Sequence, residues 1–465
     1  MNALLILALG GLQVILALFD PVLLIYFSLI TGPMPISLGR EGMLTSDFGK
    51  MDLSAIRLLG LWLASSMVLA LNIGRAWHYA KRYPFHLCFL VLAALSLFWA
   101  PSLAYGTRMF AKLSSPVLFM LLIMVVVSDK RQFATMERLF LIGGTLATGA
   151  AALFYLAGVT RNEVGLTLPS TSPALFSAYL TVVAMVVFAR LNTSAGNRTA
   201  NGLLLLCLVA GIIAAFTRIT IGALFLGISV MMLFASRGLF RFVLPVAGLF
   251  GGILLFVISD TFRNRMFMDG GSITLMSLVE DPAAAFSRVH GSGRYEAWGT
   301  VLDKFFTPSP FLGSGIGATQ NYYYSQLGGG IGVIHSEFVR LAAEVGIAGL
   351  TLFVLAIAGY LLRFLRIYRQ TPQSPAGRYA LASAASLIVY LTFMATDNAF
   401  DYFNGVGLYV FALVGMSEKA RELELAESEE EVVTTAQVED RAAPESATQP
   451  AVKPGRRRYP LLGEA

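Results

Sequence analysis

Charged residues are scarce in this sequence. Asp, Glu, Lys and Arg make up 13% of its 465 residues, whereas 56% of the residues are hydrophobic. A soluble globular protein carries about 25% charged residues. The scarcity excludes an ordinary soluble protein, and the hydrophobic residues instead form repeated blocks of about 17–25, the length of a helix that crosses a hydrocarbon core. We therefore expect an all-α, polytopic helical membrane protein.

Cysteine and histidine are also rare, which excludes two kinds of site. Cys88 and Cys207 both lie inside hydrophobic blocks, so they offer neither a disulfide framework nor a thiolate metal cluster. The histidines are His78, His86, His290 and His335. They show no metal-binding spacing such as His-Glu-x-x-His. We expect no metal and no cofactor.

Nucleic acid and a bound nucleotide are also disfavoured as partners. The net charge of +6 comes from Lys and Arg spread among loops, as membrane orientation requires, so it does not indicate nucleic acid. The run Gly313–Gly317, GSGIG, lacks the lysine of a phosphate-binding loop and a surrounding βαβ pattern. We interpret its glycines as turn residues beside the membrane.

The hydrophobic blocks predict a transmembrane domain over residues 1–417. The first two blocks meet at Asp20-Pro21 and can form a hairpin, so we expect 12–13 transmembrane helices. The candidate spans are 3–19, 21–36, 55–73, 84–100, 113–128, 138–158, 173–190, 202–216, 219–235, 242–258, 345–363, 380–396 and 404–417.

Lys and Arg predict the orientation, because they concentrate in cytoplasmic loops. One set of alternate loops is rich in them: 75–82, 130–138, 190–198, 237–241 and 363–378. The other set holds fewer: Arg40, Lys50, Arg108, Lys112, Arg161 and Arg218. We therefore expect 259–345 to be one long external loop. The acidic, then Pro/Ala/Thr-rich segment 418–465 is predicted to be a disordered cytoplasmic tail whose first dozen residues extend the last helix.

The external loop contains a helical pattern. Over residues 292–306, Trp298, Val301, Leu302 and Phe305 recur at helical spacing and form an apolar stripe. Arg294 lies one turn before Trp298 on the same side. We expect an amphipathic helix that rests on the membrane surface or caps the bundle.

His335 opens the segment HSEFVRLAAEVGIAGL, which we expect to form a helix beginning at the histidine. His335 is either an incidental surface residue or a general base. The base is chemically reasonable because the reference pKa of histidine suits proton transfer near neutral pH. The glycines and arginines around it favour the base. For Glu337, Arg340 and Glu344 we favour a structural role as a helical charge ladder.

Arginines near the external interface are candidates for phosphate binding. Arg218 lies between two hydrophobic blocks, and Arg294 or the nearby Arg288 lies in the external loop. Guanidinium binds phosphate oxygens bidentately and stays charged. The alternative for Arg218 is a snorkelling anchor. Asp397 and Asp401 flank the last external turn; they face the same cavity or, more simply, cap helices.

Residues 200–365 resemble the O-antigen ligase and O-antigen polymerase superfamily of bacterial envelopes. The matching pieces are Thr217-Arg218, SGRYEAW with Arg294, PFLGSGIG, and the His335 segment. The residue after the histidine is Ser336, where the family often has Asn.

The resemblance implies a GT-C-like glycosyltransferase in the bacterial cytoplasmic (inner) membrane, with its active site on the periplasmic side. It further implies an undecaprenyl-diphosphate-linked glycan donor, a glycan or lipid acceptor, and no metal. By analogy His335 activates the acceptor hydroxyl, while Arg218 and Arg294 hold the diphosphate. Two alternatives remain open: a transporter or flippase of lipid-linked sugars, and a non-catalytic scaffold.

Overall fold

The computed structural model describes most of the chain as helices. The described residues are 2–31, 44–46, 49–51, 53–160, 165–169, 171–193, 195–236, 238–258, 276, 280, 294–326, 334–401 and 406–442. The chain divides into two compact units, Met1–Arg421 and Glu422–Ala465. The first unit contains the helical bundle and every element that positions the site.

The N-terminal half is helical apart from one short antiparallel hairpin. Its helices are α1 (Asn2–Phe19), α2 (Pro21–Thr31), α3 (Leu53–Leu71), α4 (Ile73–Ala80), α5 (Pro84–Leu95), η2 (Ser96–Trp99), α6 (Leu103–Val126), α7 (Lys130–Leu156), α8 (Pro173–Asn192) and α9 (Arg198–Ala214). The hairpin pairs β1 (Leu44–Ser46) with β2 (Gly49–Met51).

The C-terminal half combines long helices with short ones near the site. They are α10 (Arg218–Ala235), α11 (Phe240–Ile258), α15 (Arg294–Val301), η3 (Leu302–Phe306), α16 (Ala318–Asn321), η4 (Tyr322–Gln326), α17 (Glu337–Gln370), α18 (Pro375–Thr396) and α19 (Gly407–Ala442). Helix α19 continues through Ala442, past the dozen residues expected to extend it.

The all-α polytopic membrane class is confirmed. Within the described residues, six helices are long and apolar enough to cross a membrane, namely α6, α7, α8, α10, α17 and α18. A seventh is counted if α3 and α4, which bend by 104°, form one span. Other expected blocks occur among the described residues as shorter apolar helices: Gly10–Phe19, Pro21–Thr31, Pro84–Trp99 and Arg198–Ala214. The expected number of 12–13 transmembrane helices stays a prediction.

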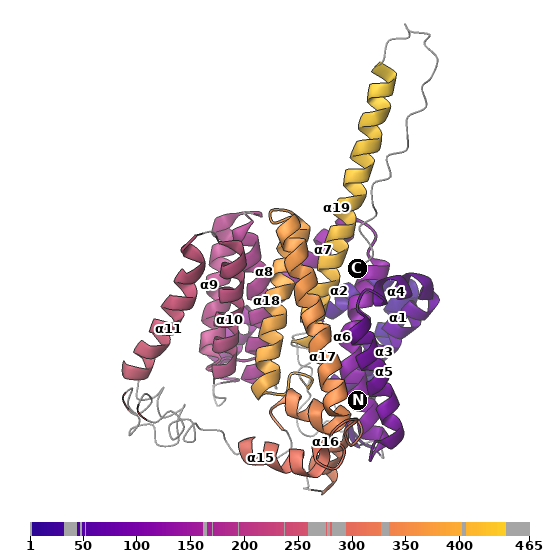
Figure 1. The fold of residues 1–465 in the computed structure, drawn as a ribbon, viewed down its shortest axis with the longest axis vertical. Helices are drawn as coiled ribbons and strands as arrows, with labels where there is room; N and C mark the ends of the chain where they lie inside the picture. Colours follow the sequence, from indigo (N-terminus) through magenta and orange to yellow (C-terminus); the bar gives the residue numbers. More distant parts are fainter. Residues whose placement is uncertain are drawn as a thin grey trace. The chain divides into compact units, whose positions relative to one another are not determined.

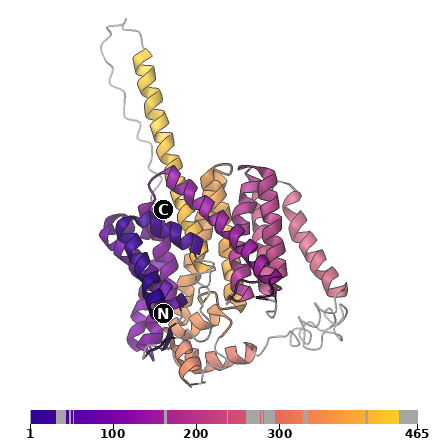
Figure 2. The same cartoon turned by 180° about the vertical axis from the view of Figure 1, so that it is seen from behind.

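The bundle has a buried centre and an apolar outer surface. Helices α6, α8 and α18 are mostly buried, whereas α7, α10 and α17 keep much of their surface exposed. The exposed side chains include Leu146, Leu153 and Leu362. An exposed surface of this composition suits lipid rather than water. The views in Figures 1 and 2 show the long helices running alongside one another.

Polar contacts fix the directions of the central helices. Arg378, at the start of α18, lies 3.8 Å from Glu137, which also pairs with Arg190 near the end of α8. Ser177, near the start of α8, hydrogen bonds to Thr220 of α10 at 2.8 Å. Helices α8 and α10 therefore run parallel, and α18 runs antiparallel to both. The start of α10 lies at the same end of the bundle as the end of α18.

Helix α6 begins earlier than expected. The sequence predicted a span over 113–128, with Arg108 and Lys112 in the preceding loop. The helix instead starts at Leu103, after Ser102, whose hydroxyl accepts a hydrogen bond from the Tyr105 amide. Lys112 is buried on this first part of α6 and pairs with Asp401, so a charged residue occurs here within the helix rather than in a loop.

Candidate functional site

His335 lies before a helix rather than on one. Helix α17 begins at Glu337, and the Ser336 hydroxyl caps it by accepting from the Val339 amide. The expectation that the helix begins at His335 is therefore wrong. The backbone of His335 has φ 52°, the left-handed region that residues other than glycine seldom adopt. Such strain costs about 1–3 kcal/mol and persists only where neighbours impose it.

The turn after α18 imposes the conformation of His335. The His335 amide donates to Asn398 Oδ1 at 3.0 Å. On the ring, Nδ1 lies 3.4 Å from Asp397 Oδ1 and 3.2 Å from Asn398 Nδ2. Asp397 and Asn398 are buried, whereas the His335 side chain is 35% exposed. One edge of the imidazole is thus held by buried polar groups while the ring stays accessible from outside.

Two protonation patterns are compatible with these contacts. With the proton on Nδ1, the ring donates to Asp397 and leaves Nε2 as an acceptor. With the proton on Nε2, the ring instead accepts from the Asn398 amide. The first pattern is the arrangement by which a carboxylate orients a histidine base.

Arg294 and Trp298 bring α15 to the same turn. Arg294 Nη1 donates to the Thr396 carbonyl at 2.8 Å, and Trp298 Nε1 donates to the Ile334 carbonyl at 2.6 Å. Thr396 directly precedes Asp397, and Ile334 directly precedes His335. The Arg294 Nε is buried and, among the residues that the structure describes, has no hydrogen-bond partner.

The predicted amphipathic helix is confirmed as α15 continued by η3. Val301 and Phe305 are buried in a cluster with Ala318, Tyr323, Ile334 and Ala343. Trp298 packs against this cluster. The stripe therefore covers protein at the start of α17, which favours the bundle cap over the surface-resting helix; α15 and α16 lie at that end in Figure 1.

Arg218 is the first residue of α10 and its side chain is exposed. Because α10 and α18 run antiparallel, Arg218 lies at the same end of the bundle as Thr396 and Asp397. Phe216, two residues before Arg218, has φ 51°. The segments that contain Arg218 and His335 thus each have a non-glycine residue with a left-handed backbone. Helix packing places Arg218 at this end of the bundle, whereas a direct hydrogen bond places Arg294 beside the turn that contacts His335.

Two residues considered from the sequence, Arg288 and His290, lie outside the described residues. The predicted role of Arg288 in diphosphate binding therefore stays a prediction.

The glycine-rich run forms the expected turns, and these pack against α6 and α17. Helix α17 is broken at Gly346, which has φ 66°. The Ser314 and Gly315 amides donate to the carbonyls of residues 343 and 344 at 2.9 and 3.0 Å. The Glu344 carboxylate in turn accepts from the Gly317 amide at 2.9 Å and from Thr319. Glu344 therefore ties the glycine-rich turn to α17, a structural role.

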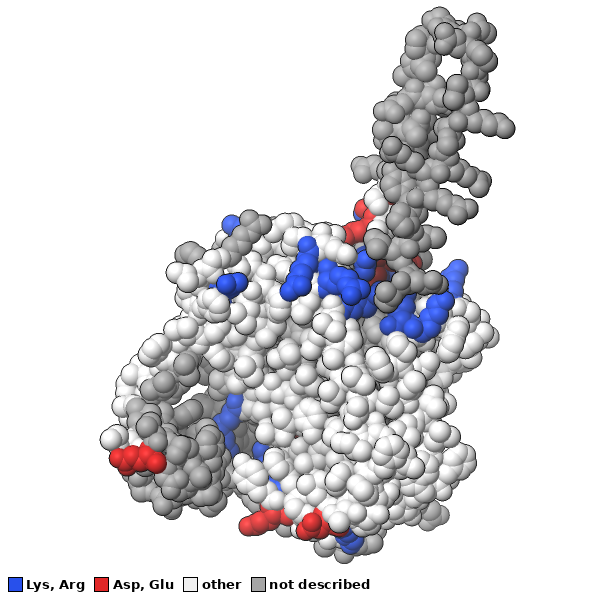
Figure 3. Space-filling view, in the orientation of Figure 1, with Lys and Arg blue, Asp and Glu red and all other residues white. Residues whose placement is uncertain are grey.

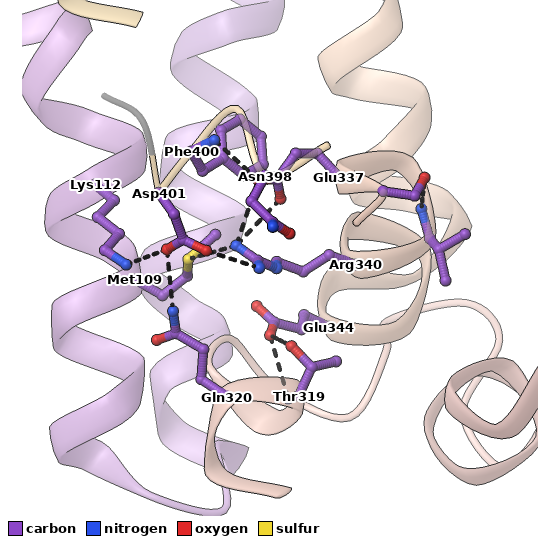
Figure 4. Close-up of polar contacts among 12 residues, drawn as sticks. Met109, Lys112, Thr319, Gln320, Glu337, Arg340, Glu344, Asn398, Phe400 and Asp401 are labelled. Carbon is purple, nitrogen blue, oxygen red and sulfur yellow. Dashed lines mark hydrogen bonds and ion pairs between the residues drawn. The ribbon is translucent and has the colours of Figure 1, made fainter. Parts of the chain in front are cut away.

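Arg340 and Glu337 belong to a buried ion network that the charge ladder only partly anticipated (Figure 4). Arg340 lies 3.2 Å from Glu337 and 3.1 Å from Asp401, and its side chain is 1% exposed. Lys112 of α6 pairs with the same Asp401, and Gln320 donates to it at 3.3 Å. Burial raises the pKa of Asp401, but Lys112 and Arg340 outweigh it and hold the pKa well below its usual range.

Sequence reasoning left open whether Asp397 and Asp401 face the site, and it did not identify the contacts of the turn after α18 with His335. Asp397 was expected to cap a helix, and it is the residue at the end of α18, but it also contacts His335. Asn398 was not considered. Each lies more than 60 residues from His335 in the chain, so no local pattern connects them.

No group of three or more His, Cys, Asp or Glu side chains suited to a metal occurs in the described part of the chain. The expectation that the protein uses no metal stays a prediction.

A family model supports the resemblance found in the sequence. The model described as O-antigen ligase matches residues 203–354, which include α10, α15, His335 and the break in α17. No curated protein matches the chain. The match and the apolar helices together support membrane glycan processing of the ligase or polymerase type. This match over residues 203–354 supports the O-antigen ligase and O-antigen polymerase superfamily for that segment of the chain.

Proposed function

We propose that the protein is a membrane glycosyltransferase that transfers or polymerises an undecaprenyl-diphosphate-linked glycan onto an acceptor hydroxyl. The acceptor is a glycan or a lipid, so the reaction is that of a polysaccharide polymerase or an O-antigen ligase. The proposal includes neither a metal nor a cofactor, because the two arginines supply the positive charge that the leaving diphosphate needs.

The reaction balances with His335 as the proton acceptor. The acceptor oxygen forms a bond to the anomeric carbon of the donor sugar, and the bond from that carbon to the phosphate oxygen breaks. The electron pair leaves with the lipid diphosphate, and the hydroxyl proton passes to Nε2 of His335. Asp397 holds Nδ1–H and stabilises the imidazolium that forms.

The observation that carries the proposal is the contact of His335 with buried Asp397 and Asn398. A surface histidine without a function needs no left-handed backbone and no buried carboxylate. Here both are present, and the ring remains one-third exposed (35%). The distance of 3.4 Å from Nδ1 to Asp397 is long for a hydrogen bond, but catalytic hydrogen bonds often shorten only when substrate is bound.

The two arginines suit a diphosphate. Arg294 uses Nη1 to reach Thr396 and retains donor capacity at its buried Nε. Arg218 opens α10, and a helix N-terminus carries partial positive charge that favours anions. In this proposal both guanidiniums neutralise the charge that develops on the leaving group.

The proposed location is the bacterial inner membrane with the site on its periplasmic side. On the face drawn in Figure 3, Lys and Arg gather at the end of the bundle where α17 ends, away from the start of α17 beside His335. The positive-inside rule makes that end cytoplasmic. This distribution supports an external site.

Complementation of a deletion strain tests the proposal, with glycan length and attachment read from gels of cell-envelope extracts. We expect His335→Ala to abolish transfer, because a positioned general base contributes about 10²–10⁴-fold. His78→Ala is the matched control, since His78 is exposed on α4. Normal glycan in the His335→Ala strain would contradict the proposal. If the protein were instead a transporter of lipid-linked sugars, its loss would leave the donor on the cytoplasmic leaflet.

A further inference from the structure

We infer that Lys112 of α6 is a positioning residue for His335, acting through Asp401 and the turn 397–401. This inference rests on the proposed function for its catalytic consequence, but the contacts that carry it are independent of any substrate. Lys112 lies outside the family-matched segment 203–354. The inference therefore assigns part of the site to the N-terminal half of the chain.

The turn 397–401 contacts both sides of the site. At its start, Asp397 and Asn398 hold the ring and the amide of His335. At its end, Asp401 is held by Lys112 and Arg340. The Asp401 amide donates to the Asn398 carbonyl at 3.0 Å, so the two ends form one hydrogen-bonded turn. A displacement of Asp401 is therefore transmitted directly to Asn398.

A third contact joins the middle of the turn to α17. The Phe400 amide donates to Glu337 Oε1 at 2.9 Å, and Glu337 also pairs with Arg340. Glu337 and Arg340 thus anchor the turn to the helix that follows His335. Lys112 anchors the same turn to α6, and it fixes where the turn lies between the two helices (Figure 4).

Burial explains why Lys112 has so much influence. Its side chain is 9% exposed, and Asp401 is 21% exposed. In a poorly hydrated site, water cannot replace a lost ion-pair partner at low cost. Without Lys112, Asp401 keeps Arg340 as its ion-pair partner and the neutral Gln320 amide as a hydrogen-bond donor. We expect Asp401 to move toward Arg340 on α17. The contacts of Asn398 and Asp397 with His335 then weaken, which leaves the imidazole more accessible.

Carbethoxylation by diethylpyrocarbonate measures this accessibility without any glycan. The full-length protein is purified in detergent, modified at pH 8, above the reference pKa of imidazole of about 6.5, and the rate at each histidine is read by peptide mass spectrometry. We expect Lys112→Met to raise the rate at His335 several-fold and Lys112→Arg to restore it. The rate at buried His86 should not change.

A double-variant cycle tests the route through Asp401. If Lys112 acts only through that carboxylate, Lys112→Met adds nothing to the effect of Asp401→Asn. Additive effects would overturn the route. Glu418→Gln is the matched control, because Glu418 is a buried carboxylate that pairs with Arg82 and Arg363 near the other end of α17. It should leave the rate at His335 as in the wild type.

The outcomes separate this inference from the proposed function. A folded Lys112→Met protein with a wild-type rate at His335 overturns the inference; if that variant does not fold, Lys112→Gln is measured by the same criterion. A raised rate without any loss of glycan transfer supports the positioning role and contradicts His335 as the base. If Lys112 positions His335 and His335 is the base, Lys112→Met lowers glycan transfer by up to about 100-fold, the effect of a displacement of about 1 Å.

Discussion

At the scale of single residues, the contacts of His335 show how the proposed general base is held in place. Its left-handed backbone is stabilised by the bond from its amide to Asn398, and its ring is oriented by Asp397. The sequence singled out His335 and Arg294 as candidates because they interrupt a chain that is otherwise hydrophobic. Asp397 and Asn398 were not predictable as partners, since the link between distant turns exists only after α17 and α18 have packed together.

Replacement of Asp397 tests the orientation of the histidine. In Asp397→Asn the side chain no longer favours the proton on Nδ1, so Nε2 is a poorer base. We expect glycan transfer to fall by ~10²-fold, within the range of general base catalysis, with normal protein levels in the membrane. Asp303→Asn, at an exposed position of η3, is the control. Equal activity of the Asp397→Asn and wild-type proteins would rule out the pair.

Replacement of the two arginines tests diphosphate binding. Arg218→Ala and Arg294→Ala should each weaken donor use by roughly 10- to 100-fold, the value of one charge-assisted hydrogen bond. Lysine at either position should restore activity only in part, because it lacks the bidentate geometry. Arg366→Ala, an exposed arginine near the other end of α17, is the control. Full rescue by lysine in kinetics with purified donor would argue against bidentate binding.

At the scale of elements, the break in α17 is what brings the glycine-rich turn to the site. Gly346 leaves the helical conformation, and carbonyls of α17 before the break accept from the turn at residues 314–315. The sequence indicated tight turns here from the glycines alone. It did not indicate that the turns pack inside the bend of a helix, because that requires the register between two separate segments.

A pair of glycine substitutions on one helix tests the break. A Cβ at Gly346 would lie 2.2 Å from the Phe311 carbonyl oxygen, and φ 66° is strained for alanine by about 1–3 kcal/mol. Gly346→Ala should therefore lower the melting temperature and reduce transfer. At Gly359 nothing lies within 4 Å, so Gly359→Ala should stabilise the helix, by about 0.5–1 kcal/mol. The same melting temperature for both variants would contradict the packed bend.

At the scale of the whole molecule, hydrophobic composition was sufficient to predict the polytopic helical class. It did not indicate that α3 and α4 bend, or that four other blocks form shorter apolar helices among the described residues. It also missed the first part of α6, where helix forms around Arg108 and Lys112 without a hydrophobic run. A search for hydrophobic runs cannot detect a helical segment that contains charged residues.

Cysteine labelling tests the predicted topology. The chain has two native cysteines, so a cysteine-free background requires only two replacements. Asp303→Cys is expected to react with a membrane-impermeant maleimide in intact spheroplasts, whereas Arg131→Cys should react only after permeabilisation. Both positions are exposed. Labelling of both from the same side would contradict the predicted orientation.

The central claim is that His335 takes the proton while the arginines stabilise the leaving lipid diphosphate, and one stoichiometric measurement tests it most directly. The purified protein in lipid nanodiscs is given lipid-linked glycan, and released undecaprenyl diphosphate is measured together with transferred glycan. We predict equal amounts from the wild-type protein and neither product from His335→Ala, with donor binding retained. Transfer without release of the diphosphate, or undiminished release by His335→Ala, would contradict the claim.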